Sequence, residues 1–405
     1  MNETHVNGAL KGIKILDFSQ LLAGPYGAMM LGDMGAEVIK IERIETGDLY
    51  RGMTFGNQYI HGQVSPTFLA WNRNKQSLSM DLKDPQVKEV IYDMVKQSDV
   101  IIHNFRPGVM EKLGYGYDVC RQLNKGIIYA SNSGFGETGP YAERPGQDLL
   151  AQGLSGIMSL IGRKGSPPTP LGTGIADHLA AYHMVYGILT ALYYREKTGL
   201  GQKVQVNLFA SMLAFMNQEM LTIMNTDIQV NKPNSGIGLP FLEAPYGVYA
   251  CRDGYITIAM NDFTKLVKVL GNDELLKYQT QEALYNNRDT IFHAIEAITS
   301  KKSKAHWLKV MLDEDLWVSE VKDIRDVEHD PQVKHMEMMT TYHHEEAGEI
   351  KVVGPAVTMS ETPADITQPP PMVGEHSVAI LKRYGVDEHV IQSMIDRSVV
   401  YTSRC

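Results

Sequence analysis

An aspartate, Asp177, stands where the segment TGIADHLAAYH (173–183) passes from a glycine-rich approach into a long run of small and apolar residues. That run predicts a helix. An aspartate at a helix entrance often accepts a hydrogen bond from a free backbone N–H, which is worth about 1 kcal/mol. The same carboxylate can instead serve as a nucleophile, because the positive helix end keeps it ionised. Nearby Gly172 and Gly174 would let backbone N–H groups approach a developing oxyanion. The segment leaves both roles open, and capping is the commoner one.

Polar and basic residues also gather just past the carboxyl ends of the predicted strands, where an open parallel sheet binds its ligands. Arg and Lys side chains hold phosphates. Each basic residue alone is typical of a surface charge. Together they predict a site for a multiply phosphorylated ligand such as a nucleotide or coenzyme A. The residues are Gln20 to Ala23, Arg43, Met80 to Lys83, Asn104 to Arg106 and Lys112.

The segment GFGETG (134–139) matches the glycine spacing of dinucleotide-binding sites. In that motif the third glycine must lead into a helix whose N-terminus holds the pyrophosphate. Here Pro140 follows at once and Pro145 comes soon after, so an ordinary helix is not expected. We therefore predict that this segment does not bind NAD.

Composition excludes several other classes of function. The chain has 405 residues and a net charge of −9, which is unsuited to holding nucleic acid or an anionic membrane. Its three cysteines form no CxxC pair, and no histidine pair has metal-ligand spacing, so we expect no metal site. The N-terminus lacks the features of a signal peptide, and there is no apolar run of about 18 residues that would span a bilayer. We expect a cytoplasmic protein.

The elements that must position these residues alternate between the hydrophobic periodicity of strands and that of helices. Strand-like and helical stretches follow one another through about the first 135 residues, which indicates βαβ units and a parallel sheet with helices on both faces. The predicted strands are 12–18, 36–43, 76–82, 99–105 and 126–132, and the predicted helices between them include 85–98 and 115–124.

Beyond these units, the chain predicts more helices and strands of the first domain and then a second, smaller domain. A helix over about 177–197, closed by Gly199, precedes a strand and another helix with methionines at 212, 216, 220 and 224. That spacing is typical of a core or subunit interface.

A linker is expected at 231–240, two strands around Arg252–Gly254, and a final helix near 387–397. The predicted domains are 1–225, 226–330 and 331–405, the last returning to the first.

Long stretches of the chain resemble the family III coenzyme A transferases, the group that includes formyl-CoA transferase and carnitine CoA-transferase. The similar segments occur in family order over nearly the whole length. They are GIKILDFSQLLAGPYGAMMLGDMGAEVIKIE, NRNKQSLSMDLK, DVIIHNFRPGVMEKLG, SGFGETGPYAERPGQDLLAQGLSG, GTGIADHLAAYHMVYGILTALYYREKTGLGQKVQVNL and PPPMVGEH.

The resemblance implies an α/β fold: a large Rossmann-like domain with a parallel sheet built from both chain ends, plus an inserted small α/β domain. It also implies an interlocked homodimer. The family's nucleophile falls on Asp177, and CoA or acyl-CoA is a substrate, with no permanently bound cofactor. The implied CoA-binding positions are Gln20, Leu22, Ala23, Arg43, Met80, Asp81, Leu82, Lys83, Asn104, Phe105, Arg106, Lys112, Arg144, Pro145, Gly146, Gln147 and Asp148.

Two departures from the formyl-CoA transferases weaken the case for formate or oxalate as substrates. Gln20 stands where those enzymes have a histidine, and their glycine-rich lid has no obvious counterpart in 225–250. The leading hypothesis is transfer of CoA from an acyl-CoA to a free carboxylic acid. An α-methylacyl-CoA racemase is the alternative enzyme, but it needs a base where this chain has Gln147. A catalytically silent CoA-binding protein is the third hypothesis.

Overall fold

The computed structural model describes residues 8–403, which form two compact units. The first comprises the chain up to Ala151, Gly174–Phe215 and the chain from Pro331 onward. The second comprises Gln152–Thr173 and Met216–Asp330. The second unit thus contains the predicted small domain, 226–330, together with 152–173 and 216–225.

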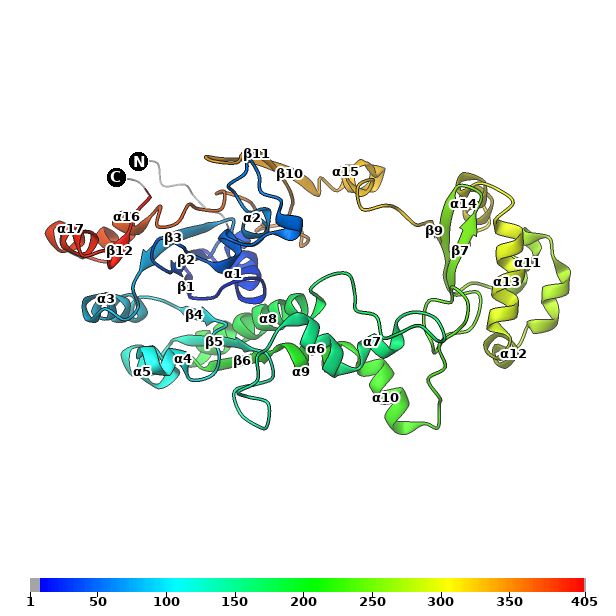
Figure 1. Cartoon of the computed structure of the whole chain (residues 1–405), viewed down its shortest axis with the longest axis horizontal. Coiled ribbons are helices and arrows are strands. Elements are labelled where there is room, and N and C mark those ends of the chain that lie inside the picture. The colour runs from blue at the N-terminus through cyan, green and yellow to red at the C-terminus, as the bar shows by residue number, and fades with distance from the viewer. Residues whose placement is uncertain (1–7, 404–405) are drawn as a thin grey trace. The chain divides into compact units, whose positions relative to one another are not determined.

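The first unit is built on the predicted parallel sheet. Its strand order among the described residues is β12-β3-β2-β1-β4-β5-β6, and every neighbouring pair is parallel except β12 with β3 (Figure 1). The strands are β1 (Lys14–Asp17), β2 (Glu37–Glu42), β3 (Lys75–Met80), β4 (Val100–His103), β5 (Ile128–Ser133), β6 (Lys203–Asn207) and β12 (Val400–Tyr401).

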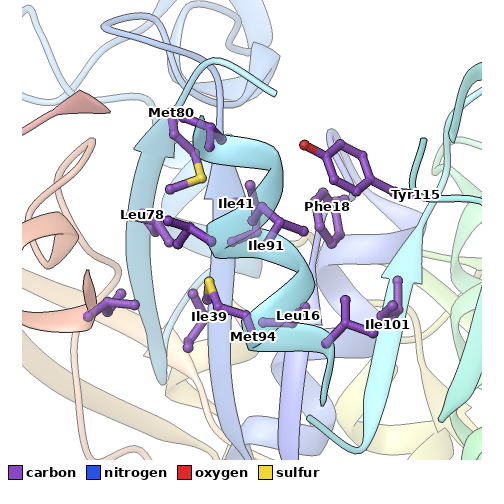
Figure 2. Close-up of a cluster of buried hydrophobic side chains, with 14 of the residues drawn as sticks. Leu16, Phe18, Ile39, Ile41, Leu78, Met80, Ile91, Met94, Ile101 and Tyr115 are labelled. Carbon is purple, nitrogen blue, oxygen red and sulfur yellow. The ribbon is translucent and has the colours of Figure 1, made fainter. Parts of the chain in front are cut away.

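Helices cover both faces of this sheet, which explains why a central strand such as β4, with the sequence VIIH, is buried on both sides. On one face α3, α5, α16 and α17 pack on the strands. Figure 2 shows Ile91 and Met94 of α3 against Leu16, Ile39 and Leu78 of three neighbouring strands. On the other face lie α1 and α8. The bounds are α1 (Ala23–Asp33), α3 (Pro85–Lys96), α5 (Tyr117–Leu123), α8 (Ile175–Thr198), α16 (Ser377–Arg383) and α17 (Glu388–Asp396).

The first unit also contains further short α-helices and one antiparallel hairpin. They are α2 (Pro66–Trp71), α4 (Val109–Leu113), α9 (Leu208–Phe215), α15 (Pro331–His335) and the antiparallel pair β10 (Met339–His344) and β11 (Gly348–Val353). Helix α6 (Asp148–Ser155) begins in this unit.

Two predicted helix boundaries have different outcomes. Helix α8 ends at Gly199, which adopts the left-handed conformation (φ 74°), as predicted. The methionine stripe, however, does not lie on one helix. The chain leaves helical geometry at Met216, between α9 and α10 (Asn217–Asn225), where it passes from the first unit to the second. Met212 is fully buried whereas Met224 is 66% exposed, so the four side chains do not share an environment.

The second unit has its own antiparallel sheet and its own core. The predicted strand pair is present as β7 (Gly247–Cys251) and β8 (Gly254–Ile258), with β9 (Val318–Glu320) added. The predicted linker, 231–240, is held in place instead. Arg288 donates a hydrogen bond to the carbonyl oxygen of Pro240 (3.1 Å), and Asp289 accepts one from the backbone of Ser235 (3.0 Å). The helices are α7 (Ile157–Leu160), α10, α11 (Phe263–Leu270), α12 (Gln281–Asn286), α13 (Arg288–Thr299) and α14 (Lys304–Leu312).

Within residues 8–403, no helix is both long enough and apolar enough to cross a membrane.

Candidate functional site

A cavity of about 810 Å³ opens at the carboxyl ends of β1 to β4 in the first unit. Side chains of three basic residues, Arg43, Lys83 and Arg106, line it and reach solvent. The cavity therefore brings together residues that the sequence placed at separate strand ends. The predicted binding residues that line it are Gln20, Arg43, Met80, Asp81, Leu82, Lys83, Phe105 and Arg106.

Other predicted binding residues have different surroundings. Leu22 and Ala23 are 7% and 2% exposed at the start of α1. Lys112 is exposed in the last turn of α4. Arg144 lies in an exposed loop with its guanidinium 3.7 Å from the ring centre of Tyr141.

Asn104 fastens the loop after β1. Its side-chain oxygen accepts a hydrogen bond from the backbone N–H of Gln20 (2.8 Å), and its amide nitrogen donates one to the carbonyl oxygen of Gln20 (2.6 Å). Both polar ends of this side chain thus hold the backbone of the loop that borders the cavity.

The loop that carries Arg144 to Asp148 is tied down by two glycines. A Cβ atom on Gly146 would lie 2.3 Å from the Cα of Gly134, so only glycines allow the two backbones to approach this closely. No helix follows GFGETG before α6 begins at Asp148. The prediction that this segment lacks the dinucleotide-binding helix is confirmed.

Asp177 lies in the first turn of α8 but does not cap it. The N-cap residue is Gly174, and no side chain at that position makes a capping bond. Instead, Asp148, which is 29 residues before Asp177 in the sequence, caps the helix. Its Oδ1 accepts hydrogen bonds from the backbone N–H groups of Ala176 (2.7 Å) and Asp177 (3.3 Å). The capping interpretation of Asp177 is therefore wrong, because the free N–H groups are already bound by another carboxylate.

The protonation of Asp177 also differs from the expectation. Burial, reinforced by the negative charge of Asp148, raises the pKa of the Asp177 carboxyl to about 7. The sequence predicted that the positive helix end would keep this group ionised. Burial opposes that effect of the helix end, and the Asp148 carboxylate, which binds the N–H groups there, adds repulsion.

A buried charge network that sequence reasoning missed supports the same region. Asp48 pairs with Lys40 (2.7 Å), and its Oδ1 accepts hydrogen bonds from the backbone N–H groups of Leu21 (3.0 Å) and Tyr50 (2.9 Å). Lys75 pairs with Asp17 (2.9 Å). The available signal was the lysine of EVIKIE, which stands among apolar residues of a strand, where a buried charge requires a partner. Lys75, at the start of KQSLSM, gave no comparable signal.

Tyr50 is near enough to Asp177, Asp48 and Asp148 for their charges to act on its hydroxyl. It lies in a short 3-10 helix, Leu49–Arg51, which Glu42 braces through its ion pair with Arg51 (2.7 Å). Burial and the nearby charges of Asp177, Asp48 and Asp148 raise the pKa of Tyr50. The phenol therefore stays protonated.

Among the residues described, no three His, Cys, Asp or Glu side chains come together in a way that would hold a metal ion.

Comparisons with known proteins identify the family of this chain. The family described as CoA-transferase family III matches residues 10–377. An acetyl-CoA:oxalate CoA-transferase of Acetobacter aceti is 34% identical over 94% of this chain and 97% of the relative. The succinyl-CoA:glutarate CoA-transferase of Homo sapiens is 31% identical over 96% and 90%, respectively.

A solved structure agrees in fold. The crystal structure of a CAIB/BAIF family protein from Brucella suis superposes with a TM-score of 0.81 at 30% identity, covering 93% of this chain and 100% of that one. The sequence match and the fold agree over nearly the whole length. The chain therefore belongs to CoA-transferase family III.

Proposed function

We propose that this CoA-transferase moves CoA from an acyl-CoA to a free carboxylic acid through covalent intermediates on Asp177. The observation that carries this proposal is the capping of α8 by Asp148. Since Asp148 binds the helix N–H groups, the Asp177 carboxylate in the first turn of α8 is not required as a cap and is left for chemistry. Family membership supplies the reaction class.

The reaction would proceed as two exchanges at one carboxylate. An Asp177 oxygen attacks the thioester carbonyl carbon, the C–S bond breaks, and CoA leaves as the thiolate, so that Asp177 and the acyl group form a mixed anhydride. The thiolate then attacks the side-chain carbonyl carbon of Asp177, which forms an aspartyl-CoA thioester and releases the donor acid. The acceptor carboxylate attacks this thioester, and the thiolate returns to the acceptor's acyl carbon, which regenerates Asp177. Covalent catalysis thereby splits one difficult exchange into easier ones.

The 810 Å³ cavity is the proposed site for the nucleotide end of CoA. Arg43, Lys83 and Arg106 would pair with its phosphates. The backbone near 80–83 and 104–106 would lie against the adenine. Binding energy from this distant part of the substrate would help to place the thioester at Asp177.

The names of relatives suggest where a search for the acids should begin. They specify succinyl-, acetyl- or formyl-CoA with glutarate, mesaconate or oxalate. We propose short dicarboxylates as the first acceptors to test. Each donor would be paired with each acid, and the CoA esters formed would be measured by mass spectrometry.

The test of the mechanism is the variant Asp177→Asn. We expect turnover to collapse while CoA binding and folding persist, because an amide cannot form the anhydride. Wild-type enzyme given acyl-CoA without an acceptor should carry a hydroxylamine-sensitive adduct on the peptide with Asp177. Asp118→Asn, which changes an exposed acid in the first turn of α5, is the matched control and should stay active. A fully active Asp177→Asn enzyme, or a wild type that never carries the adduct, contradicts the mechanism.

The two alternatives have their own outcomes in these assays. Rapid uptake of deuterium at the α-carbon without an acceptor acid would indicate a racemase. Tight CoA binding without turnover on any donor and acid pair would indicate a silent binding protein.

We also propose that two chains form an interlocked homodimer in the cytoplasm. Tyrosines along α8 support an interface there, since Tyr182, Tyr186 and Tyr193 are 48%, 61% and 64% exposed in the single chain. Large exposed aromatic side chains are typical of protein contacts. Threaded chains do not separate on dilution without unfolding, so a folded monomer in sedimentation at nanomolar concentration would refute this assembly.

A further inference from the structure

Asp148 touches the nucleophile's helix rather than the basic cavity. It opens α6, beside the start of α8 (Figure 1), and is absent from the residues that line the cavity. We propose that Asp148 is a positioning residue for Asp177: one of its oxygens fixes the first turn of α8, and its charge destabilises the Asp177 carboxylate before attack. This inference rests on the proposed function.

The first part of this role follows from the hydrogen bonds. A single oxygen, Oδ1, accepts from the N–H groups of two consecutive residues, Ala176 and Asp177. It therefore fixes the backbone of the nucleophile itself. Asp148 lies against the N-cap residue as well, since its Cγ would be 3.8 Å from a Cβ built on Gly174. The close backbone contact of Gly134 with Gly146 holds the loop from which Asp148 extends.

The second part follows from the charges around Asp177. Asp48 is compensated by its ion pair with Lys40, and Tyr50 is neutral. On α8 itself, the Nδ1 atom of His178 lies 2.6 Å from the carbonyl oxygen of Gly174. Asp148 is the acid whose charge acts on Asp177, and together with burial it raises the pKa of that carboxyl to about 7.

Repulsion between the two acids would favour the reaction. Before attack, Asp177 carries a negative charge next to Asp148. On attack this charge passes to the sulfur of CoA, and Asp177 becomes part of a neutral anhydride. The repulsion is thus present in the ionised reactant and weaker in the transition state, so it lowers the barrier for the ionised enzyme.

Asp148→Asn separates the two effects, because its side-chain oxygen can still accept both N–H bonds while its charge is lost. We expect the acid limb of the kcat/KM profile to move from near pH 7 to lower pH by about one unit. At pH 8.5 we expect the release of CoA in a single turnover without acceptor to slow by about tenfold. Affinity for CoA should not change. Asp148→Ala loses the cap as well and should show the same limb shift with a larger loss of rate.

Three outcomes overturn the proposal. If Asp148 is a CoA contact, Asp148→Asn weakens CoA binding and leaves the acid limb in place. If Asp148 is only structural, Asp148→Asn behaves as wild type at every pH. If the variant does not fold, the wild type decides, since an acid limb below pH 5 shows that no repulsion acts on Asp177. Failure of the proposed function is recognised separately, by absence of the adduct on wild-type Asp177.

Discussion

Replacing Asp177, the proposed nucleophile, should make the protein more stable, and the gain should depend on pH. The pKa of Asp177 rises from 3.8 to about 7 on folding. Because the fold favours the protonated acid, the stability contribution of Asp177 is fully present below about pH 4 and is lost as the pH rises through 7. Asp177→Asn carries no charge at any pH. Its advantage over wild type should therefore grow from pH 4 to pH 7 and then level off.

The magnitude follows from the same shift. A rise of about three units, at about 1.4 kcal/mol each, sets a ceiling of about 4 kcal/mol in unfolding free energy. Asp177 is only half-buried, so water screens part of the repulsion. We expect a gain of about 1–2 kcal/mol at pH 8 and less than half of that at pH 5.

Urea denaturation at both pH values measures this gain, with Asp118→Asn as the control for removing an exposed acid from a first helical turn. The m-value should stay constant between variants, so that midpoints report stability. A loss of stability at pH 8, or an equal gain at pH 5 and pH 8, would show that Asp177 is not held in an unfavourable ionised state.

Three further predictions concern the elements around the site. Lys40→Met leaves the fully buried Asp48 without its ion pair, so it should lower the free energy of unfolding in urea by about 3–5 kcal/mol. The control Lys309→Met breaks an exposed pair with Asp313 and should cost under about 1 kcal/mol. Equal costs would contradict the role of burial. Gly146→Ala forces a Cβ to within 2.3 Å of Gly134, so it should move Asp148 and lower kcat by about tenfold. The control Gly153→Ala in α6 places its Cβ 3.9 Å from the nearest atom and should leave kcat unchanged. Arg106→Ala should raise the KM for acyl-CoA by about tenfold with little change in kcat. This rise in KM should become smaller as salt is added, because salt screens the attraction between Arg106 and the phosphates. An unchanged KM would place the phosphates elsewhere.

Much of the fold could be predicted because it follows from local patterns. The alternation of apolar strands with amphipathic helices such as Pro85–Lys96 predicted the parallel sheet. Gly199 marked the end of α8, because a left-handed residue there strongly favours glycine. The ends of the predicted strands indicated that Arg43, Lys83 and Arg106 would come together, since parallel strands place their carboxyl ends on one edge of the sheet. By contrast, periodicity alone did not reveal the break at Met216, where the helix ends as the chain enters the second unit.

The amino-acid sequence by itself determined the family, the sheet and the choice of Asp177 as candidate nucleophile. Only the tertiary structure decided the surroundings of that acid. It is not the cap of its helix, because Asp148, 29 residues earlier in the chain, caps the helix in its place. Its protonation depends on burial and on the distance between two charges. Both are set by contacts between elements far apart in sequence, because electrostatic repulsion and desolvation depend on distances in space, which a local pattern does not contain.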